Sequence, residues 1–165
     1  MIALMMIMMG ITMRFLPHPY NVTPIAAIAL FSGVYLNKKY APWVPLAIMI
    51  LSDLVIGLHN VIAYTWGSFI LVALIGMWLK NNRTVLNIGI AAILSSFLFF
   101  VITNFGVWLT WYPRSITGLI NCYTLAIPFY RSTLLGGIMY TAAFFGLYEL
   151  SARAIRNTKF AYLAN

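Results

Sequence analysis

Apolar residues in this chain occur in long runs instead of alternating with polar residues. The run from Ile88 to Phe100 is apolar on every face that a helix would present. An outer-membrane strand would alternate apolar and polar side chains, so a β-barrel is disfavoured. Because lipid offers no hydrogen-bond partners, a spanning segment of this kind closes its backbone hydrogen bonds within a helix. The pattern therefore predicts an all-α integral membrane protein.

Six apolar segments predict six transmembrane helices in a single transmembrane domain over residues 1–165. With approximate ends, they cover residues 1–16, 22–36, 43–58, 61–79, 84–109 and 133–151. A spanning helix needs about 20 apolar residues, with a lower limit near 17. The last three segments reach that length. The first three are short, so we expect them to be kinked or to thin the bilayer locally.

The stretch between the last two segments, residues 111–132, mixes apolar residues with Pro113, Arg114, Asn121 and Pro128. The prolines and the arginine interrupt any span of useful length. We therefore expect a loop with a short interfacial or re-entrant helix on the outer side. If this stretch crossed the bilayer, the basic C-terminus would face outward, against the distribution of charge.

Composition and charge support the membrane assignment and orient the chain. Apolar residues make up 63% and charged residues only 7%, too few to cover a soluble surface. The net charge is +8, and cationic loops explain it better than nucleic-acid binding does. With six spans, one side holds Lys38, Lys39, Lys80, Arg83, Arg153, Arg156 and Lys159, and the other holds Arg14, Arg114 and Arg131. Basic residues favour the cytoplasm, so we predict that both termini are inside.

No constellation of residues predicts catalysis, a metal or a cofactor. The chain has no glycine-rich phosphate loop, no zinc-binding HExxH pair and no GxSxG elbow. Cys122 is the single cysteine, and neither His18 nor His59 has an acidic cluster beside it. We therefore expect a protein that is not an enzyme and binds neither a cofactor nor nucleic acid.

Asp53 is the most informative single residue. It lies about five residues from the outer end of its segment, so it is roughly 8 Å deep. A carboxylate there costs a few kcal/mol unless it is paired, hydrated or protonated. It is either a ligand or proton site facing an outward cavity, or a structural carboxylate bonded between helices. Glu149 precedes Arg153 by four residues, which is the favourable order for a helical ion pair, and we interpret it as structural.

Polar and aromatic residues gather at the predicted outer ends of the helices and suggest a binding site. We predict one outward cavity formed by Asp53, Asn104, Arg14 and Arg131, with aromatic walls, and with Asn21 and His59 in the adjoining loops. The aromatic residues are Tyr64, Trp66, Trp108 and Tyr130. Tyrosine and tryptophan also mark membrane interfaces in general, so these four carry less weight. Two cations and one carboxylate suit a small planar polar molecule.

Several stretches resemble a family of uncharacterised bacterial membrane proteins related to the substrate-binding S components of energy-coupling factor (ECF) vitamin transporters. The stretches are residues 14–27 (RFLPHPYNVTPIAA), 51–54, 103–108 and 127–136. The resemblance implies a multi-pass protein of the bacterial inner membrane that binds a vitamin-like or nucleobase-like substrate near the outer face. It also implies partners, namely a membrane coupling subunit with two ATPases.

One feature departs from that family. S components often dock the coupling subunit through an AxxxA motif on the first helix, whereas the first segment here offers only Ala3 and Gly10. Ala26, Ala27 and Gly33 of the second segment are a possible substitute. A solitary transporter remains open as an alternative. So does a non-catalytic accessory subunit of a larger membrane complex, in which Asp53 would be structural.

Overall fold

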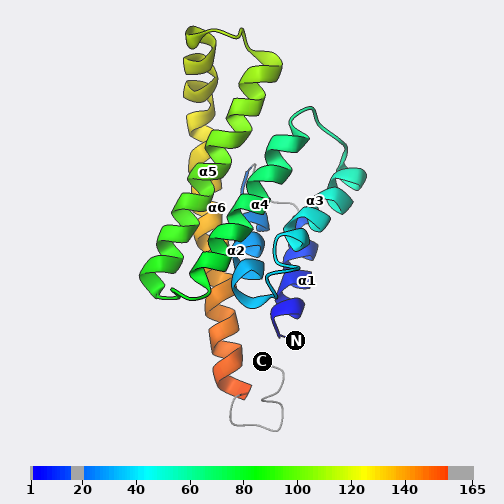
Figure 1. The fold of residues 1–165 in the computed structure, drawn as a ribbon, viewed down its shortest axis with the longest axis vertical. Coiled ribbons are helices and arrows are strands. Elements are labelled where there is room, and N and C mark those ends of the chain that lie inside the picture. Colours follow the sequence, from blue (N-terminus) through cyan, green and yellow to red (C-terminus); the bar gives the residue numbers. More distant parts are fainter. Residues whose placement is uncertain (1, 16–20, 156–165) are drawn as a thin grey trace.

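The computed structural model describes residues 2–15 and 21–155, apart from the side chains at positions 2, 6, 14 and 15. Within that part the chain forms six α-helices and no strand, which confirms the all-α prediction (Figure 1). The helices are α1 (Ile2–Phe15), α2 (Ile25–Tyr35), α3 (Trp43–Ile56), α4 (Ile62–Leu79), α5 (Val85–Trp111) and α6 (Ile116–Ile155).

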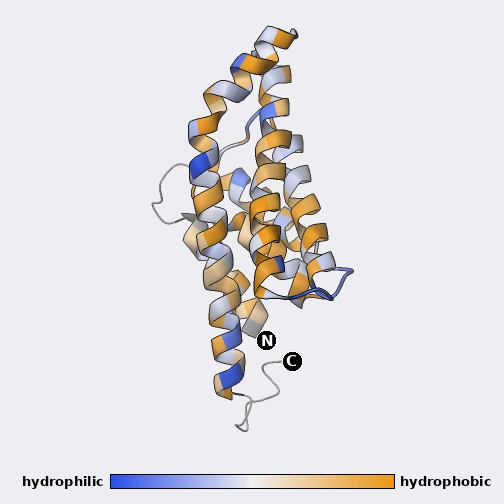
Figure 2. Cartoon of the chain, turned by 90° about the vertical axis from the view of Figure 1, so that its left-hand side faces the viewer, coloured by the Kyte–Doolittle hydropathy of each residue, from blue (hydrophilic) through white to orange (hydrophobic). Residues whose placement is uncertain are grey.

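Three of these helices, α4, α5 and α6, are long and apolar enough to cross a membrane. Large apolar side chains are widely exposed on the outside of the bundle, as Leu54 and Leu86 illustrate at 66% and 71% exposure. In Figure 2, hydrophobic colour covers the helices along most of their length. Such a surface is stable in lipid and unfavourable in water. These features indicate a membrane protein.

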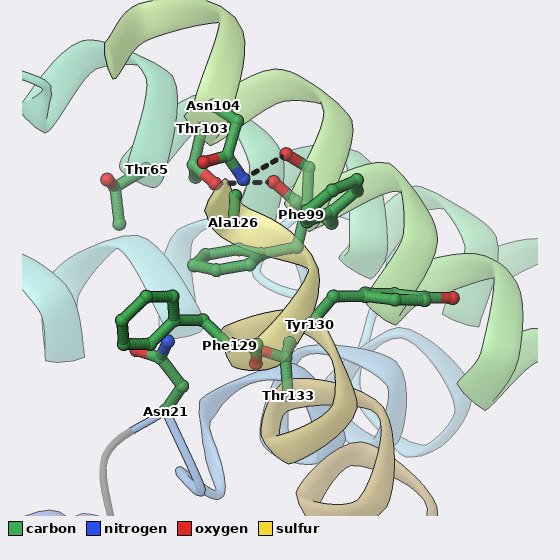
Figure 3. A pocket seen from close by; sticks show the side chains of 10 residues that line it. Asn21, Thr65, Phe99, Thr103, Asn104, Ala126, Phe129, Tyr130 and Thr133 are labelled. Carbon is green, nitrogen blue, oxygen red and sulfur yellow. Dashed lines mark hydrogen bonds between the residues drawn. The ribbon is translucent and has the colours of Figure 1, made fainter. Parts of the chain in front are cut away.

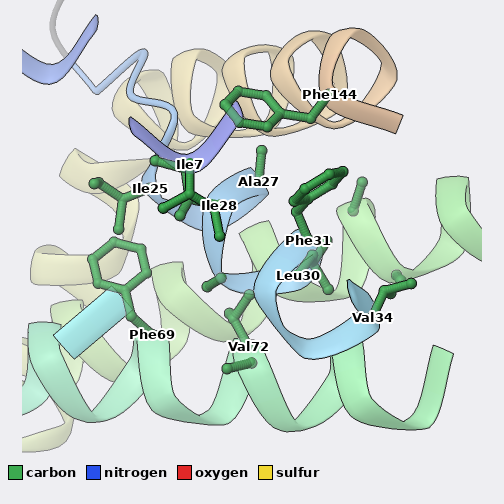
Figure 4. Close-up of a cluster of buried hydrophobic side chains, with 14 of the residues drawn as sticks. Ile7, Ile25, Ala27, Ile28, Leu30, Phe31, Val34, Phe69, Val72 and Phe144 are labelled. Atoms are coloured by element: carbon green, nitrogen blue, oxygen red, sulfur yellow. The ribbon is translucent and has the colours of Figure 1, made fainter. Parts of the chain in front are cut away.

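The short helix α2 lies at the centre of the bundle and contacts the other five helices. Its residues Ile28, Leu30 and Phe31 are fully buried, and apolar side chains surround it on every face (Figure 4). This explains why its sequence shows no polar face. Eleven residues extend only about 16 Å, so α2 fills the middle of the bundle.

An aromatic cluster fixes the C-terminal half of α6 to α2. The ring of Phe31 lies 5.7 Å from that of Phe144, 5.5 Å from that of Phe145 and 5.6 Å from that of Tyr148, each near edge-to-face. Tyr35 continues the cluster, with its ring centroid 3.9 Å from that of Tyr148. Edge-to-face pairs each add about 0.5–1.5 kcal/mol beyond the area that they bury.

Two glycines allow the backbones of α2 and α4 to touch. A Cβ atom added at Gly33 would overlap the carbonyl oxygen of Ala73 and lie 2.7 Å from the Cα of Gly76. A Cβ added at Gly76 would overlap the carbonyl oxygen of Leu30. Small residues of this kind are typical of close helix crossings in membranes, where packing drives association.

The region between the last two predicted spans differs from the expectation. Residues 116–132 do not form a loop with a short helix, because they are the first part of α6, which runs for 40 residues, or about 60 Å. The α5–α6 hairpin is bonded along this part: the Tyr123 hydroxyl donates to the carbonyl of Val101 at 2.6 Å. Pro128 cannot donate to the carbonyl of Thr124, but both residues are exposed, so the ring and the freed carbonyl lie at the surface.

Basic side chains from three segments meet at one end of the bundle. Lys80 donates to the carbonyl of Leu36 at 3.3 Å, and the Arg83 guanidinium lies over the Tyr35 ring at 5.2 Å. Arg153 donates to Glu149 at 2.9 Å, which confirms the predicted helical ion pair. Two further predicted members of this group, at positions 156 and 159, lie outside the described residues.

The glycine crossing gives a first prediction. Gly33→Ala should lower the free energy of unfolding by about 1–3 kcal/mol, the usual cost of overpacking, because α2 and α4 would have to separate. Gly67→Ala is the matched control, since a Cβ at this position of α4 meets no atom within 4 Å. Thermal unfolding in detergent should show a loss for the first variant alone. Equal behaviour of the two variants would show that the crossing does not depend on glycine.

Candidate small-molecule site

A cavity of about 240 Å³ lies between α4, α5, α6 and the turn that precedes α2 (Figure 3). Six of its lining residues have polar side chains and four are apolar. They are Asn21, Thr65, Phe99, Phe100, Thr103, Asn104, Ala126, Phe129, Tyr130 and Thr133. Among the residues that the structure describes, no charged side chain lines this cavity.

Most polar side chains of the cavity already donate a hydrogen bond to the backbone of their own helix. The hydroxyls of Thr65, Thr103 and Thr133 donate to the carbonyl oxygen four residues earlier, at 3.2, 2.7 and 3.1 Å. The amide nitrogen of Asn104 does the same at 2.8 Å. Each hydroxyl oxygen keeps acceptor capacity, and so does the Asn104 carbonyl oxygen. The cavity therefore offers several hydrogen-bond acceptors, beside the second amide N–H of Asn104 and the amide of Asn21.

Aromatic rings form the apolar walls. The rings of Phe100 and Tyr130 lie 4.8 Å apart, and those of Phe69 and Phe99 lie 5.0 Å apart, so the walls are held by packing behind them. In Figure 3, the Phe129 ring lies close to Asn21, and the Tyr130 hydroxyl points away from the cavity. Flat aromatic walls with a few aimed polar groups are typical of small-molecule sites.

Asn21 closes the cavity from the turn before α2. Its backbone has φ of 62°, the left-handed region, which asparagine tolerates better than most residues. This conformation turns the chain into Pro24 and then α2. It also places the Asn21 amide in Figure 3 beside the cavity, opposite Asn104.

Asp53 belongs to a different cluster, between α3 and α4. Its side chain is almost completely buried, and Trp66 donates its indole N–H to Asp53 Oδ2 at 2.8 Å. The Nε2 atom of His59 lies 4.0 Å from the same oxygen, and the His59 side chain is 39% exposed. The N–H of Gly57 donates to the Asp53 carbonyl at 2.8 Å and ends α3, since Gly57 has φ of 121°. The carboxylate thus joins the end of α3 to α4.

The structure therefore divides the predicted site. Asn21, Asn104 and Tyr130 come together in the cavity, whereas Asp53, His59 and Trp66 form the second cluster. Asn104 lines this cavity and Asp53 does not, so the two residues lie in different places. The reason is that the Asp53 carboxylate points toward Trp66 on α4, while Asn104 faces α6.

Two other predicted aromatic residues have packing roles. The Tyr64 ring fills the space beside Gly106, where an added Cβ would overlap it, and so holds α4 against α5. The indole of Trp108 donates to the carbonyl of Pro113 at 3.0 Å and closes the turn between α5 and α6.

Of the two predicted arginines, the structure describes the side chain of Arg131 alone. Arg131 is exposed and precedes Thr133 by two residues, which places it about 200° around α6, on the face opposite the cavity. Arg131 therefore does not line this cavity. The Arg14 side chain lies outside the described part of the structure.

The sequence alone does not identify the three threonines of the cavity as residues of a binding site. Thr65 stands between Tyr64 and Trp66, which the sequence analysis placed in the site, and Thr103 directly precedes Asn104. A threonine that bonds its own helix is inexpensive to bury in an apolar segment, so it does not stand out as Asp53 does.

The chain matches the model of a family of unknown function (DUF6580) over residues 1–159, so it belongs to that family. No curated protein and no solved structure matches it significantly. Assignment of a function therefore depends on the residues themselves.

The Asp53 cluster gives a second prediction. Trp66→Phe removes the indole donor from a buried carboxylate and should lower the free energy of unfolding by about 1–3 kcal/mol. Trp78→Phe is the control, because Trp78 lies on the same helix and is 52% exposed. Thermal unfolding of both variants measures the difference. A Trp66→Phe protein as stable as the control would show that this bond does not anchor α3.

Proposed function

We propose that this protein is the substrate-binding membrane component of an uptake system for a small, uncharged molecule that donates hydrogen bonds. The observation that carries the proposal is the cavity described above, which offers acceptors on Thr65, Thr103 and Asn104 and, among its described residues, no charged group. An ionised ligand would lose its hydration there without a counter-charge. A neutral ring with N–H or O–H groups would match both the acceptors and the aromatic walls.

The size of the cavity supports a vitamin-like or nucleobase-like ligand. Its volume of about 240 Å³ is below the roughly 300–1,000 Å³ of sites for drug-sized molecules. The ligand would therefore be a single ring system or a similar compact solute. This fits the substrate class that the resemblance to S components implies.

Six spans with both termini in the cytoplasm, in the bacterial inner membrane, are part of the proposal. The gathering of Lys80, Arg83 and Arg153 at one end of the bundle supports this orientation, because basic residues favour the cytoplasmic side. The cavity is lined from α5 by Phe99–Asn104, toward the opposite end of that helix, and would thus lie nearer the outer face.

The energy source would be a partner, as in S components, where a coupling subunit and ATPases drive release. Most of the small residues that the sequence offered for docking lie inside the bundle, and Ala26 is partly buried. Ala27 and Gly33 are buried in the bundle, and Gly10 packs against Ile28 and Phe144. A coupling subunit would have to contact an outer surface, such as the face of α1 that exposes Leu4, Met5 and Met8.

The alternative of an accessory subunit is favoured by one observation, the structural role of Asp53 between α3 and α4. Gentle purification separates the two proposals. A large complex that co-purifies in fixed ratio supports the accessory subunit, and stabilisation by small neutral molecules supports the transporter.

A third prediction concerns the ligand. Nicotinamide and uracil, both neutral with N–H donors, should stabilise the purified protein against heat, whereas nicotinate, an anion of similar size, should not. Thr103→Val should weaken binding by roughly twofold to tenfold, the effect of losing one hydrogen bond. Thr110→Val is the matched control, since Thr110 also bonds its own helix on α5, at 2.8 Å to Gly106, but does not line the cavity. Preference for nicotinate would refute a neutral site.

A fourth prediction concerns orientation. In a Cys122→Ser background, a membrane-impermeant thiol reagent should label Leu58→Cys in intact cells and leave Lys38→Cys unlabelled until the cells are lysed. Both positions are exposed in loops at opposite ends of α3. The native Cys122 is unsuitable as a reporter because it is 2% exposed. Labelling of position 38 from outside would overturn the proposed topology.

A further inference from the structure

A second and larger space lies along α5 and α6, at the end of the bundle where the basic residues meet. It encloses about 620 Å³ and is called the basic groove below. Its lining comprises Tyr35, Arg83, Thr84, Val85, Ile88, Gly89, Ala92, Ile138, Thr141, Ala142, Phe145, Gly146, Glu149 and Arg153. The cavity that contains Asn104 is called the neutral cavity below. Unlike it, the basic groove combines charged groups at one end with apolar groups along the rest.

The charged end has a net positive charge. Arg83 and Arg153 face a single carboxylate, that of Glu149, which Arg153 already engages at 2.9 Å. Arg83 lies over the Tyr35 ring and remains able to direct several N–H donors toward a ligand. Lys80 stands at the same end of the bundle. An anionic group, and a phosphate in particular, suits two guanidinium groups in this arrangement.

The remaining length of the groove is apolar and open because small residues line it. Gly89 and Gly146 have no atom within 4 Å of an added Cβ, so neither backbone packs tightly against a neighbour there. Ile88, Ala92 and Ile138 supply apolar walls. A space of this shape between two long helices fits a hydrocarbon chain.

One buried polar group points to a ligand at the boundary between these parts. Thr141 lines the groove, is 2% exposed, and has no hydrogen-bond partner for its hydroxyl among the described residues. Such a hydroxyl is costly to bury alone. Thr141 lies four residues, or about 6 Å along α6, from Phe145. The ring of Phe145 lies 5.8 Å from that of Tyr35, over which Arg83 lies. Along the groove, the arginine, the Thr141 hydroxyl and the apolar walls thus follow one another in the order of phosphate, ester and hydrocarbon in a phospholipid.

We infer that the basic groove binds an anionic phospholipid. The phosphate contacts Arg83 and Arg153, an ester carbonyl accepts the hydrogen bond of Thr141, and an acyl chain lies against Ile88, Ala92 and Ile138. A free phosphate would satisfy the arginines alone and leave both Thr141 and the apolar walls unoccupied. A zwitterionic lipid would bring the cation of its own headgroup toward the two arginines.

Native mass spectrometry of the full chain in detergent tests this inference. Phosphatidylglycerol should be retained in preference to phosphatidylcholine, and soluble glycerol phosphate should neither bind nor compete. Arg83→Gln should weaken retention of phosphatidylglycerol roughly fivefold and reduce its preference over phosphatidylcholine, as expected for one cation near a charged lipid. Equal retention of the two lipids, or competition by glycerol phosphate, would overturn the inference.

Two variants separate binding from folding. Gly146→Leu should fill the groove and reduce lipid retention, whereas Gly67→Leu, also placed where an added Cβ meets no atom, should not. Gly146→Leu and Gly67→Leu each replace a glycine within a helix, so both variants should fold. Thr141→Val keeps the shape of the side chain and removes the unpartnered hydroxyl. It should reduce lipid retention while leaving the protein at least as heat-stable without lipid. Unchanged retention in both Gly146→Leu and Thr141→Val would show that the lipid binds elsewhere.

Discussion

The close approach of α2 and α4 at Gly33 and Gly76 is the contact on which the rest of the bundle depends. In lipid, apolar side chains gain little by leaving the solvent, so helices associate through dense packing between backbones. Without side chains at these two positions, α2 is held directly against α4. Because α2 contacts all five other helices, its position also determines theirs. Its shortness then leaves space above its first residue, Ile25, where the turn containing Asn21 borders the neutral cavity.

Hydrophobic runs predict the helices well because the bilayer imposes a simple rule. The expected segment at residues 61–79 agrees with α4 to within one residue, and that at 84–109 agrees with most of α5. The rule failed at α6, where Pro128 and Arg114 suggested a break. Arg114 is in the turn before the helix, and Pro128 faces outward, so neither stops it. The loss of one backbone hydrogen bond is tolerated at an exposed face, and the sequence alone does not reveal which face that is.

The binding site was only partly predictable, for a related reason. Asn104 was among the predicted site residues, and it does line the cavity. Charged residues misled the prediction, since a charge is expected to point inward, toward water or a ligand. Asp53 does point inward but is held by Trp66, and Arg131 points away because of the rotation of α6. That rotation is set by contacts between α5 and α6, which the sequence of either helix alone does not reveal.

The neutral cavity and the basic groove lie along the same pair of helices, which raises the question of what keeps them apart. Gly137 of α6 meets the hydroxyl of Ser96 on α5, and an added Cβ there would overlap it, so the two helices touch at this level. The cavity residues Phe99–Asn104 follow this contact along α5, and the groove residues Arg83–Ala92 precede it. An acyl chain bound in the groove would therefore meet this contact before it reached the cavity, and a solute bound in the cavity would lie on the other side of it from Arg83. The separation allows a single helix pair to present acceptors without charge at one end and guanidinium groups at the other.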